Sequence, residues 1–347
     1  MLQEKIEPVW LAAFESLLAR CAVQPGDTVA VLAESQSRPV LVELAQLAAA
    51  RLGARCFTLT LPTPSAAGAP PVRSTGASHA LQNIAPVVAA LAGSTLVVDC
   101  TVEGLMHAPE LPAILKGGAR VVYVSNEHPE ALARLAPTED GSLEPRVKEH
   151  VKRLRAARRM QVTSPAGTDL SISLEGAVVG GNWGYTTRPG TMTHWPGGLA
   201  LAFPAAGAVN GRLVLAEGDV NLTFKRYLEK PVTLTIESDY VTRIEGQGLD
   251  ADLMRSYIAA WGDREAYAVS HVGYGLNERA RWDSMALNDK RDFNGTELRA
   301  FAGNFLYSTG ANEVAGRHTL GHFDLPMRQC TITLDGTVVV DGGRLVA

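Results

Sequence analysis

The regular alternation of helical and strand patterns in the first 125 residues most constrains the fold of this 347-residue chain. Apolar residues at helical spacing in 9–21 precede a strand-like apolar run at 28–33. The same order recurs until a strand at 120–125, and Gly53 marks the end of the second helix. Parallel strands joined by crossover helices produce this order, so the pattern predicts a parallel sheet covered by helices.

The pattern changes after residue 160, where Gly, Thr and Val become frequent and short runs alternate between apolar and polar residues. These runs predict antiparallel strands, with one helix at about 250–261 and a closing hairpin turned by Asp335-Gly336-Thr337. A basic helix at 142–159 is expected to link the halves through a solvated face or to contact another subunit. We therefore predict two domains, an α/β domain at 1–159 with a parallel sheet and a strand-rich α+β domain at 160–347.

Charge and composition exclude several classes of partner. The formal net charge is -4, so no global basic field attracts nucleic acid or an anionic membrane. Glu4 and Glu7 occupy the region where a signal peptide would be basic and then apolar, and the four cysteines form no C-x-x-C pair. We expect a cytoplasmic protein that binds neither nucleic acid nor membrane.

The predicted parallel sheet does not carry a nucleotide-binding motif. The first strand is followed by Glu34-Ser35-Gln36-Ser37, which lacks the glycines that allow a pyrophosphate to approach the backbone. The loop from Asp99 to His107 is a better candidate for function, because ligands of open α/β sheets bind beyond the carboxyl ends of the strands.

Three residues of the second half form a candidate metal site. In a strand, His322 and Asp324 would project from the same face, and His271 lies in a second strand-like run. Two imidazoles and one carboxylate with open coordination positions are typical of non-haem ferrous oxygenases. Other interpretations remain open: these side chains could be hydrogen-bonded core groups, and His318 is a competing ligand. We expect three further histidines at the surface, His79, His128 and His150.

Four segments carry a resemblance to a known family. They are Ser270-His271-Val272-Gly273-Tyr274-Gly275-Leu276-Asn277, Gly321-His322-Phe323-Asp324, Gly181-Asn182-Trp183-Gly184 and Thr193-His194-Trp195-Pro196-Gly197-Gly198. With these motifs and its length, the chain resembles the 2,5-dihydroxypyridine 5,6-dioxygenases of nicotinate catabolism. It is more distantly similar to two-metal leucyl aminopeptidases, in which a Glu stands at the place of His271.

The resemblance implies a reaction and a cofactor. Ferrous iron held by His271, His322 and Asp324 would add both atoms of dioxygen to 2,5-dihydroxypyridine and open the ring between carbons 5 and 6, which gives N-formylmaleamate. The resemblance also points to His107 as an acid/base group supplied by the first domain. Such an arrangement predicts a cleft between the domains, or a site shared between subunits of a homo-oligomer.

Further residues are candidates for substrate binding. His194 could donate a hydrogen bond to the substrate, Trp183 and Trp195 could cover the faces of its ring, and Ser308 could orient it, with Asn304 as a weaker candidate on the same strand face. A metallo-aminopeptidase is the alternative function. The charges favour one metal ion, because two divalent ions need several carboxylates to offset their repulsion, whereas the three predicted ligands include only Asp324.

Overall fold

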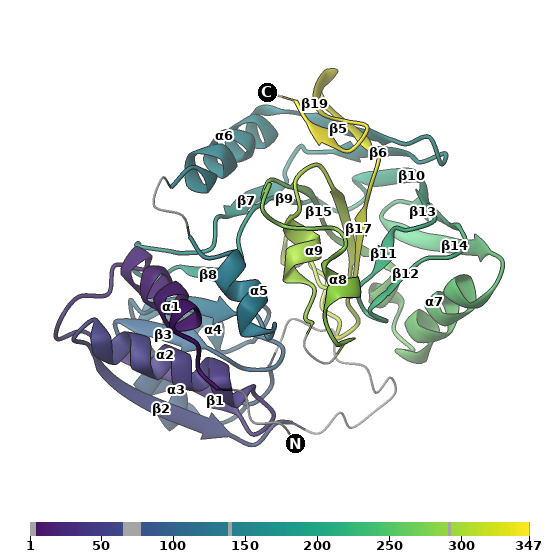
Figure 1. The fold of residues 1–347 in the computed structure, drawn as a ribbon. Helices are drawn as coiled ribbons and strands as arrows, with labels where there is room; N and C mark the ends of the chain where they lie inside the picture. Colours follow the sequence, from purple (N-terminus) through teal and green to yellow (C-terminus); the bar gives the residue numbers. More distant parts are fainter. Residues whose placement is uncertain (1–4, 65–77, 138–140, 291–292, 347) are drawn as a thin grey trace.

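The computed structural model describes residues 5–64, 78–137, 141–290 and 293–346. In Figure 1 the purple and blue N-terminal elements form one body and the green and yellow C-terminal strands form another beside it. This arrangement confirms the predicted fold class, an α/β domain with a parallel sheet and a strand-rich α+β domain.

The N-terminal body contains a five-stranded parallel sheet with the order β2-β1-β3-β4-β8. The strands are β1 (Thr28–Glu34), β2 (Arg55–Leu61), β3 (Leu96–Asp99), β4 (Arg120–Val124) and β8 (Met192–Trp195). The helices that surround the sheet are α1 (Pro8–Arg20), α2 (Pro39–Arg51), α3 (Ala85–Ala92), α4 (Leu111–Lys116) and α5 (Pro129–Arg134).

Alternate residues of β1 face opposite sides of this sheet. Val29 and Val31 belong to the core cluster that contains α1, α2 and α5, whereas Ala30 and Leu32 belong to the cluster that contains α3 and α4. All four side chains are fully buried, because helices cover both faces. Double coverage explains why the strand appears in the sequence as a continuous apolar run.

Strand β8 extends the N-terminal sheet although it follows the basic helix in sequence. Its residues pair in parallel with β4, so the chain returns from the second half to complete the first sheet. The domain boundary between residues 159 and 160 stays a prediction. The return has a functional consequence, because it places His194 at the carboxyl edge of the parallel sheet.

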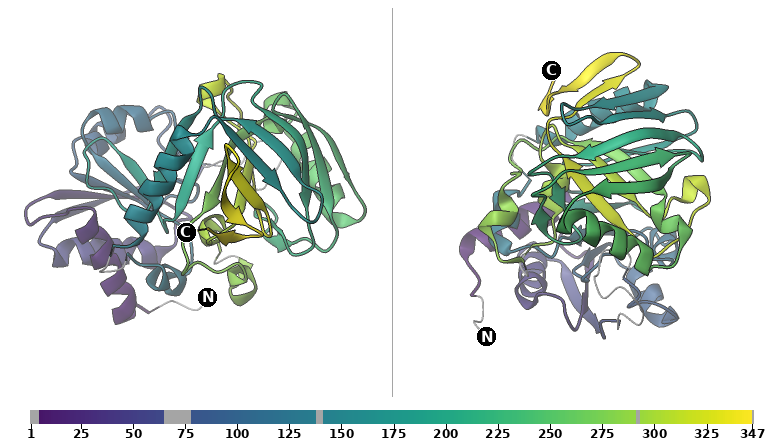
Figure 2. Two further views of the ribbon diagram at one scale, coloured as in Figure 1. Left: turned by 90° about the horizontal axis from the view of Figure 1, so that it is seen from above. Right: turned by 90° about the vertical axis from the view of Figure 1, so that its right-hand side faces the viewer.

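The C-terminal body contains two antiparallel sheets (Figure 2). One has the order β14-β13-β10-β6-β5-β18-β19-β20 and the other the order β17-β16-β15-β9-β7. The strands of the larger sheet are β5 (Arg159–Thr163), β6 (Asp169–Ser173), β10 (Val209–Leu215), β13 (Val232–Glu237), β14 (Tyr240–Gly246), β18 (Thr331–Leu334), β19 (Thr337–Asp341) and β20 (Arg344–Leu345). Those of the smaller sheet are β7 (Val178–Asn182), β9 (Leu199–Phe203), β15 (Val269–Gly275), β16 (Phe305–Thr309) and β17 (Phe323–Met327).

Short elements complete this body. Strands β11 (Val220–Asn221) and β12 (Arg226–Tyr227) pair with each other, and α6 (Leu143–Ala156) packs on β7 and β9. The remaining helices are α7 (Leu249–Ala260), α8 (Ser284–Leu287) and α9 (Thr296–Ala300), with 3-10 turns at Arg264–Tyr267 and Glu313–Ala315. Among the described residues, no helix is both long and apolar enough to cross a bilayer.

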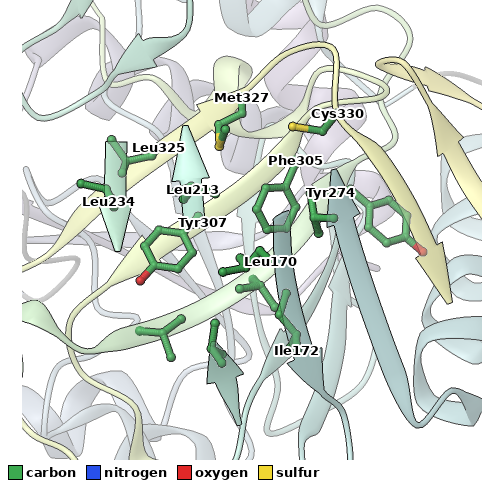
Figure 3. Close-up of a cluster of buried hydrophobic side chains, with 14 of the residues drawn as sticks. Leu170, Ile172, Leu213, Leu234, Tyr274, Phe305, Tyr307, Leu325, Met327 and Cys330 are labelled. Carbon is green, nitrogen blue, oxygen red and sulfur yellow. The ribbon is translucent and has the colours of Figure 1, made fainter. Parts of the chain in front are cut away.

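The two antiparallel sheets enclose the main core of the C-terminal body (Figure 3). The larger sheet contributes Leu170, Ile172 and Leu213, which meet Phe305 and Tyr307 of the smaller sheet. Burial of each such side chain contributes about 1.5–3 kcal/mol to folding. The core thereby fixes β15, β16 and β17, the three neighbouring strands that carry the predicted site.

The predicted terminal hairpin is confirmed. Strands β18 and β19 pair around Asp335 and Gly336, whose φ angles are 48° and 85°. Positive φ at both central residues matches the twist of a two-residue hairpin, which explains the Asp-Gly sequence.

Candidate functional site

A cavity of about 380 Å³ lies between the carboxyl edge of the parallel sheet and the smaller antiparallel sheet. The N-terminal sheet and its loops contribute His107, Tyr123 and His194 to its wall, and the C-terminal body contributes His271 and Asp324. The sequence left open a cleft between domains or a site shared between subunits, and the cavity lies where the first of these would be.

Strand register places three polar residues side by side across the smaller sheet. His271 of β15 pairs with Ser308 of β16, which in turn pairs with Asp324 of β17. Ser308 Oγ donates a hydrogen bond to Asp324 Oδ1 and lies 3.1 Å from His271 Nε2. The pairing of β15, β16 and β17 thus brings together two predicted metal ligands that lie 53 positions apart in the chain (324 − 271).

His322 joins this group from the residue that precedes β17. Its Nε2 lies 3.3 Å from Asp324 Oδ1, and His271 Nε2 lies 3.8 Å from the same oxygen. The two imidazole rings are stacked with 5.8 Å between their centroids and 27° between their planes. Both imidazoles therefore approach one carboxylate oxygen inside the cavity.

Arg299 of α9 binds the other oxygen of the same carboxylate. Its Nε donates to Asp324 Oδ2 at 2.6 Å, and the Asp324 side chain is only 4% exposed. Burial raises the pKa of Asp324, but Arg299 and the two imidazoles together outweigh this effect and hold the pKa well below its ordinary value. Asp324 is therefore a carboxylate at neutral pH.

His107 extends into the cavity from the turn that follows β3. Its ring centroid is 6.0 Å from that of His322. Asp99 holds the start of this turn, since its carboxylate accepts hydrogen bonds from the backbone of Thr101 and Leu105. Burial, followed by the nearby His322, lowers the pKa of His107 to about 4 although Asp324 opposes the shift. The imidazole is therefore neutral at pH 7.

His194 lies on β8 and also faces the cavity. Its Nδ1 is 3.0 Å from the carbonyl oxygen of Pro196 and 2.8 Å from Asn182 Nδ2. Asn182 Oδ1 accepts hydrogen bonds from Gly184 N and Thr193 Oγ1, which orients the amide nitrogen toward the imidazole. Burial lowers the pKa of His194 to about 4, so this ring is also neutral at pH 7.

The two tryptophans do not reach this cavity. Trp195 is fully buried, its ring lies 5.2 Å from Phe14, and its Nε1 donates to the Leu135 carbonyl. Side chains alternate along β8, so Trp195 faces the side opposite to its neighbour His194. Trp183 lies beside Lys148 and, with Trp195, lines a second and smaller cavity. Neither Trp183 nor Trp195 lines the cavity that holds the histidines, so the structure does not support the expectation that they cover the substrate ring.

Apolar side chains from the smaller sheet form the wall instead. Leu201, Phe203 and Leu306 face the cavity, and the Phe203 ring lies 5.4 Å from that of His271. Phe293 also lines the cavity. Sequence reasoning missed this wall because each residue has the pattern of an ordinary buried strand residue.

Other sequence candidates lie away from the cavity surface. Ser308 is fully buried behind His271 and Asp324. Asn304 donates hydrogen bonds to the backbone carbonyls of Arg299 and Phe301. His318 is exposed and does not line the cavity.

Of the three histidines expected at the surface, His79 and His128 are half-buried. The expectation was wrong for His150, which is 7% exposed because α6 packs it against Tyr274.

The part of the chain that the structure describes holds no group of three or more His, Cys, Asp or Glu side chains already arranged around a metal position. His271, His322 and Asp324 nevertheless line one cavity, where Nε2 of each imidazole approaches Asp324 Oδ1. Two imidazoles and a carboxylate are chemically suited to a divalent transition metal.

Comparison with known proteins identifies the family. The model of the 2,5-dihydroxypyridine 5,6-dioxygenase family matches residues 9–347. The chain belongs to this family. The 2,5-dihydroxypyridine 5,6-dioxygenase of Pseudomonas putida KT2440 is 40% identical to it over 96% of this chain and 95% of the relative.

Solved structures agree with this family assignment. The structure of the 2,5-dihydroxypyridine dioxygenase from P. putida KT2440 superimposes with a TM-score of 0.90 at 38% identity, over 97% of each chain. Wild-type AmpT from Thermus thermophilus superimposes with a TM-score of 0.63 at 16% identity, over 97% of this chain and 99% of that one. The second likeness shows a shared fold alone.

Proposed function

We propose that this protein cleaves 2,5-dihydroxypyridine between carbons 5 and 6 with dioxygen and forms N-formylmaleamate, using one ferrous ion held by His271, His322 and Asp324. Family membership over residues 9–347 supports the reaction. The convergence of three candidate ligands in one cavity is the structural observation that carries the proposal. Both atoms of dioxygen enter the product.

The donor distances support a shared metal ligand set. Asp324 Oδ1 lies 3.3 Å from Nε2 of His322 and 3.8 Å from Nε2 of His271, so the three candidate ligands present their metal-binding atoms to one small region of the cavity. Ferrous iron bound there would supply open coordination positions for the ring hydroxyl and dioxygen.

The surrounding side chains orient the ligands and set the charge of the site. Ser308 donates to Asp324 Oδ1 and Arg299 donates to Oδ2, so the carboxylate cannot rotate freely. Such outer contacts fix the direction in which a ligand presents its lone pairs. Arg299 offsets the negative charge of Asp324, so a divalent cation bound there would leave the site positive and would favour a hydroxypyridine that has lost a proton.

We assign two different roles to the neutral histidines of the cavity, proton transfer to His107 and substrate binding to His194. The His107 imidazole is neutral at pH 7, so one of its ring nitrogens carries a lone pair, and we assign to it the role of accepting the proton of the ring hydroxyl and returning it later in the reaction. Nδ1 of His194 lies beside the Pro196 carbonyl, and we assign to the His194 side chain a hydrogen bond with the substrate. Leu201, Phe203 and Leu306 form an apolar wall for the flat ring and exclude water.

Anaerobic loading with ferrous iron followed by a pulse of oxygenated buffer tests the proposal. We expect one iron per chain, loss of the dihydroxypyridine absorbance and an equal consumption of dioxygen. The variants His271→Ala, His322→Ala and Asp324→Ala should lose iron, whereas His107→Ala should keep iron and react at least tenfold more slowly. No turnover by fully loaded protein would reject the reaction, and equal iron loss in His107→Ala would reject its acid/base role.

The same measurement separates the metallo-aminopeptidase alternative. That function requires two metal ions per chain and release of leucine from small amides. The described residues around the cavity favour one ion, because Asp324 is the one carboxylate that both imidazoles approach.

A further inference from the structure

A short helix carries Arg299 to the metal-ligand candidate Asp324. Helix α9 (Thr296–Ala300) has five residues, and Asn294 and Thr296 at its start line the cavity together with Arg299. A helix of this length is unstable on its own, because one turn costs more conformational entropy than its hydrogen bonds recover. Its position must therefore come from contacts with other elements.

Glu127 supplies the most direct of these contacts from the other body. It follows β4 at the carboxyl edge of the parallel sheet and is 2% exposed. Its Oε1 accepts hydrogen bonds from Gly295 N at 2.8 Å and Thr296 N at 3.0 Å, and its Oε2 accepts one from Asn294 N at 2.9 Å. One buried carboxylate thus binds three consecutive backbone N–H groups.

Neighbouring groups of the N-terminal body reinforce this attachment. Ser125 Oγ lies 2.6 Å from Thr296 Oγ1, with either oxygen able to donate. Arg134 of α5 donates to both carboxylate oxygens of Glu297 at 2.7 Å. All these partners belong to the N-terminal body, which also carries His107 and His194, whereas Asp324 belongs to the C-terminal body. Helix α9 is therefore where the two halves of the cavity are aligned.

We propose that Glu127 is a positioning residue for the reaction, which it serves by holding α9 so that Arg299 meets Asp324. The part of this proposal that concerns iron binding rests on the function proposed above. Glu127 touches neither substrate nor metal ligand. It acts through the backbone of α9, and the Arg299 side chain transmits the position to the ligand carboxylate.

A glutamine at this position isolates the effect. Glu127→Gln keeps the size of the side chain, but its amide nitrogen is a donor, so Asn294 N–H or the Gly295 and Thr296 pair loses its acceptor. The start of α9 must then shift or lose a hydrogen bond. Ser125→Ala is a milder variant that removes one side-chain contact of the same helix. Asp250→Asn is the matched control, because Asp250 is a buried carboxylate that accepts backbone hydrogen bonds from Glu229 and Lys230 away from the cavity.

Two measurements compare these variants in the full-length protein. The first is the exchange rate of the Arg299 Nε proton in the metal-free protein, with its NMR signal identified by its loss in Arg299→Lys. The second is the dissociation constant for ferrous iron by anaerobic dialysis. We expect Glu127→Gln to exchange this proton at least tenfold faster and to bind iron about tenfold more weakly, because outer-shell contacts commonly change metal affinity by 10–100-fold. Ser125→Ala should also raise the exchange rate of the Arg299 Nε proton and weaken iron binding, but by less than Glu127→Gln does.

The control decides the interpretation. Asp250→Asn should lower the melting temperature while leaving the Arg299 exchange rate and iron affinity at wild-type values. Unchanged Arg299 exchange in both Glu127→Gln and Ser125→Ala, or an equal change in Asp250→Asn, would overturn the positioning role. If the wild-type protein binds no ferrous iron, the proposed function fails, while the Arg299 exchange rates still test the attachment of α9.

Discussion

Replacing Arg299 by methionine tests the electrostatic arrangement of the site. Methionine retains most of the side-chain length but removes the guanidinium whose Nε lies 2.6 Å from Asp324 Oδ2. The Asp324 side chain is 4% exposed, so its charge cannot be solvated well by water after the substitution. The variant therefore leaves a buried carboxylate with Ser308 and two imidazoles as neighbours.

The magnitude follows from this burial. Removing one partner of a buried ion pair lowers the free energy of unfolding by about 3–5 kcal/mol. For Arg299→Met we expect a decrease of about 3 kcal/mol, because the Arg299 side chain is 20% exposed. Removal of both charges in the double variant Arg299→Met/Asp324→Asn should cost much less than the sum of the two single variants. A double-mutant cycle should then give a coupling of about 2 kcal/mol.

Urea unfolding of the metal-free proteins at pH 7 and pH 5 measures these energies. In the wild-type protein the depressed pKa of Asp324 means that its contribution is present above the unfolded pKa and is lost as the pH falls through the folded pKa. Without Arg299 the effect of burial remains and raises the pKa, so the variant can take up a proton on acidification. The stability difference between the two proteins should therefore narrow from pH 7 to pH 5.

Two outcomes would refute this reasoning. Equal stability of Arg299→Met and wild type at pH 7 would show that the carboxylate does not depend on the guanidinium. A coupling energy near zero would show that the two residues act independently despite their contact.

Two further predictions concern backbone strain and acid stability. Gly104 has φ +79°, and a Cβ there would lie 3.1 Å from the Tyr123 ring. Gly104→Ala should therefore lower the free energy of unfolding by more than the roughly 1–2 kcal/mol that the left-handed conformation alone costs a residue with a Cβ. The substitution should also slow turnover, because it displaces the turn that carries His107. Gly118→Ala is its control, because Gly118 has φ +93° and nothing within 4 Å; equal loss of turnover in both would contradict the argument. Burial is the main cause, and Arg153 the second, that lowers the pKa of His150 to about 4. Below pH 6.5 the unfolded chain therefore binds a proton at this histidine that the folded protein does not bind, so the free energy of unfolding decreases as the pH falls toward 4. His150→Gln should remove roughly 1–2 kcal/mol of that loss after allowance for solvent screening, measured by urea unfolding at pH 7 and pH 5; an unchanged pH dependence would contradict it.

Local sequence patterns were sufficient to predict most of the individual elements. The apolar run at 28–33 became β1 (Thr28–Glu34), and the helix expected at about 250–261 became α7 (Leu249–Ala260). The Asp335-Gly336 turn formed the predicted hairpin. These features depend on periodicity, turn preferences and burial of neighbouring residues, which a single sequence contains.

Part of the site could also be anticipated. His322 and Asp324 are two positions apart, so a strand would place them on one face. In the structure His322 directly precedes β17, and its Nε2 lies 3.3 Å from Asp324 Oδ1. His271 was a candidate from its strand-like run and the ligand set, His107 was a candidate from the family resemblance, and both line the same cavity. The sequence could not place Trp195, because the side of β8 on which it lies depends on how β8 docks against β4.

By itself the sequence determined the order of the elements, the character of each half and the residue types able to bind a metal. Only the tertiary structure decided that β8 returns to the first sheet, that Ser308 lies between His271 and Asp324, that Arg299 binds Asp324, and that Glu127 binds the start of α9. The physical reason is that these contacts join segments far apart in the chain, and their pairing is set by packing of whole sheets rather than by any local periodicity. A lone arginine on a five-residue helix has no sequence signal that distinguishes it from a surface residue.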